Sequence, residues 1–326
     1  MSNFSVKGID NIFSATAINE LQDNIIEFFD WNLLDKGNYF NVTKGETSPN
    51  GNDYSLLRLS SYPHYSPGQA WEGFRKNWVW QSGVSPPDGF SDPIVSSNNT
   101  YPGISGVYVD DQFHPTSGVG TYAHTVDYFN GRVVFDNPIP TGSKVQAEYS
   151  YKYVNVIYAD NVPWLREVQY RTLDVPPSFS DNTKGDFKLP AEMRVQLPAI
   201  AIEVVPRRNF KGYALGGGQY VYTDVLFHCI AEDAYTRNTL LDLVSFQNEK
   251  SINIFNSNTI ADSGSFPIDY RGVPVSGALR YPDLVNTYPK TVCRFMNFTV
   301  QGMEMINTNF SAGIARCTTE LIKPNI

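Results

Sequence analysis

The 326-residue sequence lacks the features by which several common functional classes are recognised. It holds three cysteines, Cys229, Cys293 and Cys317, with no C-x-x-C pair, and at least one of the three must stay unpaired. We interpret them as buried thiols of a protein from a reducing compartment. The four histidines lie at no metal-ligand spacing, so neither a metal nor a cofactor is predicted.

Charge and long apolar runs are also scarce. Charged residues make up 18% of the chain, the net charge is −8, and no basic run is longer than Arg207-Arg208. A dedicated DNA-binding protein needs clustered Lys and Arg, so DNA is expected only as passing cargo. No window approaches 18 apolar residues, which predicts no transmembrane helix and no membrane partner. The start, MSNFSVKGIDNIF, lacks the basic and apolar regions of a secretory signal, so we expect a soluble protein made in a cytoplasm.

Catalytic motifs are missing as well. Gly216, Gly217 and Gly218 are followed by Gln-Tyr, where a phosphate-binding loop needs Lys-Ser or Lys-Thr, so they are interpreted as a turn before a strand. No G-x-S-x-G elbow is present, and Asp110-Asp111 lacks the ligand spacing of a calcium loop. The chain is therefore not predicted to be an enzyme. A hydrolase whose site is assembled only by the fold stays open as an alternative.

Aromatic residues and turn formers are what the sequence has in abundance. Aromatics reach 14%, and Gly and Pro together number 24 + 21 = 45, which favours a β-rich protein with extensive contact surfaces. The predicted fold class is α+β: an N-terminal helix and a β-sandwich-like or barrel-like domain, then an α+β domain with a mixed sheet and one long amphipathic helix. Three segments are expected. They are 1–100 with the helix and aromatic-rich loops, 101–175 with the β-rich domain, and 176–326 with the α+β domain.

Periodicity predicts the individual elements. An amphipathic helix is expected over 14–36, ending at Gly37, and a hairpin is expected at Asn130-Gly131. Alternation over 145–152 predicts one half-buried strand, and the Tyr- and Val-rich run of 220–230 predicts another. A second helix is expected near 235–252, capped by Glu232 or Asp233. Its apolar stripe is formed by Leu240, Leu241, Val244, Ile252 and Phe255.

Aromatic and arginine side chains are the candidates for protein contacts, because interfaces are enriched in them. The interface candidates are Trp71, Trp78, Trp80, Tyr128, Phe129, Arg132, Tyr220 and Tyr222. The three tryptophans also motivate an alternative function, a carbohydrate-binding β module. The N-terminal helix and the β-rich segment are expected to be the chief contact surfaces, so that a chain without residues 1–37 keeps its C-terminal domain folded.

Two stretches resemble a known class of proteins. YFNGRVVFDNPIPTGSKVQAEYSYKYV is similar to a hairpin of tailed-bacteriophage structural proteins, and ALGGGQYVYTDVLFHCIAEDAYTRNTLLDLV resembles neck and tail-terminator proteins of the head–tail connector type. The resemblance implies a virion protein, made in the host bacterial cytoplasm, that assembles with itself into a ring, most simply a hexamer. It also implies other tail, neck or portal proteins as partners. A baseplate or tail-tip protein is the alternative within the same setting.

Overall fold

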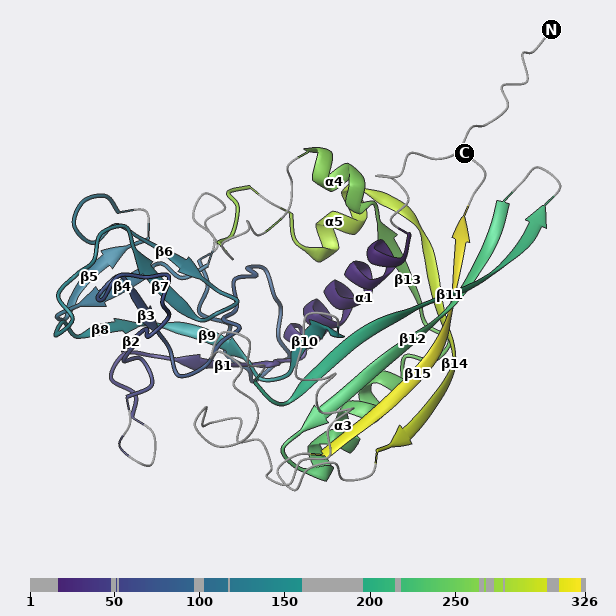
Figure 1. The fold of residues 1–326 in the computed structure, drawn as a ribbon, viewed down its shortest axis with the longest axis horizontal. Helices are drawn as coiled ribbons and strands as arrows, with labels where there is room; N and C mark the ends of the chain where they lie inside the picture. The colour runs from purple at the N-terminus through teal and green to yellow at the C-terminus, as the bar shows by residue number, and fades with distance from the viewer. Residues whose placement is uncertain are drawn as a thin grey trace, which may run out of the picture.

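The computed structural model describes residues 17–47, 51, 53–96, 103–116, 118–159, 196–214, 218–263, 267, 273–277, 279–303 and 311–323. Within these ranges the protein is α+β and rich in strand, as the sequence predicts. Small β-sheets lie at one end of the molecule, and a curled six-stranded sheet with helix α1 against it lies at the other (Figure 1).

The larger sheet has the strand order β10-β11-β12-β15-β14-β13. It is mixed, because β10 runs parallel to β11 whereas the other neighbouring strands are antiparallel. The strands are β10 (Asn155–Tyr158), β11 (Ala199–Ala214), β12 (Gly218–Ala231), β13 (Ser251–Phe255), β14 (Pro289–Gly302) and β15 (Ser311–Lys323). The strand predicted over 220–230 is confirmed within β12, whereas Gly216 and Gly217 lie outside the described residues.

Helix α1 (Ala17–Leu34) confirms the first predicted helix, whose expected start at Ser14 lies outside the described residues. Gly37 ends it with a positive φ of 83°, and its N–H donates to Leu34 O. The apolar side of α1 packs into the core of the six-stranded sheet, with Ile25 fully buried. The helix therefore belongs to the core of the C-terminal sheet, and removing residues 1–37 opens that core instead of leaving it intact.

Helix α3 (Ala234–Ser245) is shorter than predicted. Asp233 caps it by accepting from the backbone N–H of Thr236, but the helix ends at Ser245, seven residues before the expected end. Glu249 adopts a left-handed φ of 67° in the following turn, and the chain then enters strand β13. The sequence pattern places Ile252 in the helical stripe, but a short apolar run fits the period of a strand as well as that of a helix. In β13 it alternates with exposed neighbours and faces the same core as Leu240 and Leu241.

Three small sheets form the other end of the molecule. Their strand orders are β1-β9, β2-β3-β7-β6 and β5-β4-β8. The strands are β1 (Tyr39–Val42), β2 (Arg58–Leu59), β3 (Ala70–Glu72), β4 (Gly106–Val109), β5 (Gln112–Pro115), β6 (His124–Asp127), β7 (Arg132–Phe135), β8 (Val145–Ala147) and β9 (Tyr149–Lys152). The hairpin predicted at Asn130-Gly131 is confirmed as β6–β7.

The single strand expected over 145–152 is divided at Glu148 into β8 and β9, which pair with different partners. Its polar residues were expected to face water, but Gln146 and Ser150 are buried. Each finds a partner: Gln146 donates to Asp53 of a loop at 2.8 Å, and Ser150 donates to Asn41 of β1 at 2.7 Å. A polar side chain inside is stable once it is hydrogen-bonded, which the alternation pattern cannot foresee.

One hydrophobic core joins residues from both sides of the boundary expected at residue 100. Trp71 and Trp78 from the aromatic-rich segment pack with Val107, Val133 and Tyr149. The core of the six-stranded sheet is a separate cluster, which takes in α1. The short helices α4 (Ser257–Ser263) and α5 (Tyr281–Thr287) contribute to a third cluster beside it. The two main cores therefore divide the chain differently from the three predicted segments.

Glu27 of α1 gives the fold a pH dependence. Burial raises its pKa to about 7, the Asp30 and Asp23 carboxylates add to the rise, and Lys152 opposes it. Because the folded state binds this proton more tightly than the unfolded chain does, the carboxylate costs stability as the pH rises from 4.5 toward 7. We expect Glu27→Gln to raise the free energy of unfolding by about 1 kcal/mol at pH 8, some water contact being kept.

At pH 4 the same substitution is expected to change little, since Glu27 is then protonated in both states. Urea titrations of both proteins at the two pH values measure the effect. Glu249→Gln is the control, because Glu249 pairs with Arg294 at the surface. An equal gain at both pH values would show that the fold does not raise the pKa of Glu27.

Candidate interaction surface

The distal half of β11 is exposed, whereas Val221 and Thr223 on the neighbouring strand β12 are buried. Every β11 residue from Pro206 to Gly212 is exposed, and β11 and β12 extend away from the rest of the molecule there (Figure 1). Phe210 keeps 57% of its surface in water, with Arg208 over its ring at 6.0 Å. We call residues 206–212 the arm. An exposed aromatic among cations is the kind of surface that interfaces favour.

A bulge sets the base of the arm. Val204 pairs with Val225, but the next registered pair is Arg208 with Thr223, so β11 carries extra residues there. The buried Thr223 hydroxyl donates to Val205 O at 2.8 Å and lies 3.1 Å from Arg207 O, which satisfies carbonyls that the ladder leaves open. Pro206 has no N–H to offer at this edge. The bulge thus bends β11 at a fixed point, and beyond it β11 pairs with β12 on one edge only.

Both sides of the six-stranded sheet have an unpaired stretch within the described residues. β10 pairs with β11 only at Ala199–Ile202, so β11 has an open edge from Glu203 onward. On the other side, β13 pairs with β14 up to Arg294, and the backbone N–H of Phe295 donates to Lys250 O just beyond that pair. No described strand pairs with this side of β14 beyond that point. Open edges offer rows of N–H and C=O groups to another chain.

The sheet face away from α1 and α3 is polar. Tyr222 donates to Glu320 at 2.7 Å, and Asp224 accepts from Thr318 at 3.0 Å and pairs with Arg316 across β12 and β15. Cross-strand pairs of this kind are stable in water. At the buried end of the face, His228 lies 3.0 Å from Glu203, which makes it the structural histidine that its apolar strand suggests.

Five of the eight predicted interface residues are buried inside the chain, so they form core and not surface. They are Trp71, Trp78, Trp80, Tyr128 and Arg132. Trp78 stacks on Tyr149 with ring centroids 4.0 Å apart. The sequence could not separate these roles, because large aromatics serve cores and interfaces equally well. With its tryptophans buried, the carbohydrate-binding alternative loses the residues that motivated it.

Arg132 is buried although its side chain is charged, because its guanidinium has partners inside the protein. It lies 3.6 Å from Asp127 and 3.8 Å from Glu72, with the rings of Tyr62 and Tyr65 beside it. A buried charge persists when it is paired in this way.

Three predicted interface residues remain at the surface. Phe129 is 59% exposed in the β6–β7 turn, and Tyr220 and Tyr222 are partly exposed on β12 near the arm. The structure therefore brings only the two tyrosines to the candidate surface. Sequence reasoning missed Arg208, Phe210 and Lys211. Their signal was the basic pair at 207–208 within an otherwise acidic chain, considered only as a DNA contact.

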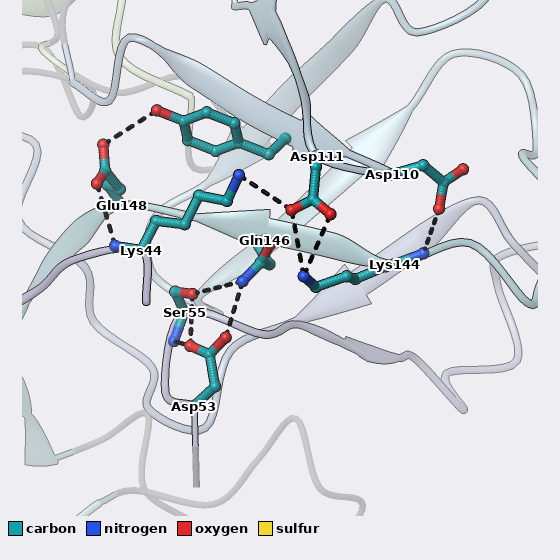
Figure 2. A network of polar contacts seen from close by, with 9 residues as sticks. Lys44, Asp53, Ser55, Asp110, Asp111, Lys144, Gln146 and Glu148 are labelled. Atoms are coloured by element: carbon teal, nitrogen blue, oxygen red, sulfur yellow. Dashed lines mark hydrogen bonds and ion pairs between the residues drawn. The ribbon is translucent and has the colours of Figure 1, made fainter. Parts of the chain in front are cut away.

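Asp110 and Asp111 form the turn of the β4–β5 hairpin, with positive φ values of 49° and 67°. Figure 2 shows how their carboxylates are used. Asp110 accepts from the backbone N–H of Lys144 at 2.8 Å, and Asp111 lies between Lys44 and Lys144 at 3.1 and 3.2 Å. Hydrogen bonds from the two lysines lower the pKa of Asp111. This carboxylate pair holds loops together.

The rest of the network in Figure 2 is also structural. Asp53 accepts from Gln146 and from Ser55, and Glu148 accepts from the backbone N–H of Lys44 at 3.0 Å. These polar groups are bonded to one another, so none is a free acid or base. In the part of the chain that the structure describes, no group of three or more His, Cys, Asp or Glu side chains is placed to hold a metal ion.

The cysteines have the burial that the sequence predicts. All three are free and buried, and burial raises the pKa of Cys229 and of Cys293 to about 12. Thiols in this state are poor nucleophiles. Among the described helices, none is long and apolar enough to cross a membrane.

No family model matches this chain, and no curated protein matches it.

Proposed function

We propose that the protein is a virion structural protein of a tailed bacteriophage, a ring-forming subunit of the neck or tail terminator at the head–tail junction. The observation that carries the proposal is the pair of open edges, on β11 and on β14, at opposite sides of one sheet within the described residues. Copies that join unlike edges make a heterologous contact, and such contacts give a closed ring when the rotation closes. The sequence resemblance supplies the setting.

The open edge of the arm can pair with a strand of a neighbouring copy. Strand addition satisfies backbone groups in register, and side chains next to the edge choose the partner. Arg208 and Lys211 place positive charge on one edge of a chain whose net charge is −8, which favours approach of a neighbour over random association. A hexamer remains the expected ring. DNA remains cargo of the ring, since no basic run in the sequence is longer than two residues.

Two other functions stay as alternatives. A baseplate or tail-tip protein uses the same ring-forming contacts and differs only in its place in the particle. A hydrolase needs a free acid, base or nucleophile, and the carboxylates and thiols described above are bonded or buried.

Labelling of particles tests the proposal. Gold-tagged antibodies against the purified protein are applied to phage from an infection with the phage that encodes it, and the particles are imaged. Label at the head–tail junction is the expected result. Label at the tail end selects the baseplate alternative, and particles that never carry label overturn the assignment to the virion.

A further inference from the structure

Five aromatic rings form a continuous surface strip on the β-rich end of the molecule. We call it the aromatic strip, and its members are Phe40, Tyr54, Phe74, Tyr151 and Tyr153. Tyr54 stacks on Phe74 at 4.2 Å between centroids, Phe74 meets Tyr151 at 5.3 Å, and Phe40 contacts both Tyr151 and Tyr153 at 5.6 Å. None of these rings was a candidate from the sequence.

The strip is open to water and uneven. Phe40 is 51% exposed and Tyr153 is 43% exposed. Phe74 stands at 81° to Tyr151, and Phe40 stands at 88° to Tyr153. Sugars prefer flat ring faces, whereas rings set at right angles leave gaps that receive protruding side chains. A protein surface therefore fits the strip better than a glycan does.

A cation completes the strip. The guanidinium of Arg75 lies 5.9 Å from the centre of the Tyr151 ring. Among the described residues, no carboxylate pairs with it. An arginine over a tyrosine at an interface commonly meets a partner carboxylate, because its planar fork binds two oxygens at once. The surface that fits is thus aromatic, protruding and acidic.

Helix α3 of the same chain has such a surface. Tyr235 and Phe246 are 82% and 79% exposed, far more than most large apolar side chains. The exposed Asp242 lies seven residues after Tyr235 and four residues before Phe246. At these spacings the three side chains lie on one side of the helix. No cation of the described residues pairs with the Asp242 carboxylate. We call Tyr235, Asp242 and Phe246 the α3 ridge.

The two surfaces lie by opposite edges of the sheet. Two of the five rings lie on strands, Phe40 on β1 and Tyr151 on β9, and β9 leads into β10, the neighbour of β11. Phe246 follows the end of α3, where the backbone N–H of Glu249 donates to Phe295 O of β14 at 2.9 Å. We infer that the α3 ridge of one copy docks on the aromatic strip of the next, with Asp242 against Arg75. This contact rests on the proposed ring and adds side-chain specificity to its edge pairing.

Charge reversal tests the contact. Purified wild type, Arg75→Glu, Asp242→Arg and the double variant are compared by sedimentation velocity over a range of concentrations, with melting curves as the folding control. Each single reversal is expected to raise the concentration at which rings form by tenfold or more, and the double variant is expected to recover most of the loss. Asp88→Arg, at an exposed loop position, is the matched control.

The outcomes separate this inference from the proposed function. Wild-type rings that neither reversal weakens overturn the contact and leave the ring standing. Rings that form normally in all variants, with fewer infectious particles from Arg75→Glu, assign the strip to a different protein and also overturn it. A wild type that stays monomeric at every concentration overturns the ring and the contact together.

Discussion

Leu241→Asp is expected to abolish soluble expression of the protein. Leu241 is 4% exposed on α3 and packs into the core of the six-stranded sheet. Removing a core leucine costs about 2–5 kcal/mol, and an unpaired carboxylate in its place adds several more. The total stability of a domain is only about 5–15 kcal/mol, so the folded state is largely lost. The measurement is the soluble fraction after expression, with circular dichroism on any protein recovered.

Thr239→Asp is the matched control, because it introduces the same residue two positions away on the exposed side of α3. It is expected to change the melting temperature little. Equal tolerance of both substitutions would mean that the buried side of α3 is assigned wrongly.

Reversing two charges on the arm is expected to prevent assembly without unfolding the protein. Arg208 and Lys211 are exposed, so Arg208→Glu with Lys211→Glu removes no core contact. The double change takes the net charge from −8 to −8 − 4 = −12 and puts acid on the edge that has to approach an acidic neighbour. Like charges brought together cost several kcal/mol at an interface. We expect ring formation to fall by a hundredfold or more, measured by sedimentation velocity.

A second double variant, Lys36→Glu with Arg58→Glu, carries the same net charge. Both side chains are exposed and belong to neither edge of the six-stranded sheet. Equal loss of rings in the two variants would attribute the effect to net charge, and the arm would have no special role.

The strand after the glycines and the start of α3 were predictable, because their signals are local. The run after the glycines is β12, and Asp233 caps α3. What failed depended on the rest of the molecule. Ile252 fits a helical stripe as well as a strand, and only the left-handed turn at Glu249 decides between them. Helix α1 joins a sheet that begins more than a hundred residues later, which no local pattern records.

The candidate site was the least predictable part, since it depends on which side chains remain uncovered. Tryptophan is common in interfaces, but Trp71, Trp78 and Trp80 are buried in the core. Phe40 and Tyr151 form a surface pair only because β1 and β9 place them opposite each other. Whether an aromatic residue is exposed depends on the complete fold. Composition indicates only what share of the aromatic residues is expected to be buried.

Cysteine crosslinking tests the central claim, that copies join unlike sheet edges in a closed ring, most directly. Asn209→Cys places a thiol on the β11 edge and Gln301→Cys places one on β14, while the three native cysteines are buried and weakly reactive. With a short bis-maleimide, each single variant is expected to stay at 36.6 kDa, and the double variant is expected to give a ladder of multiples that ends at one ring size. Dimers from either single variant, or a double variant that does not crosslink, would contradict the account.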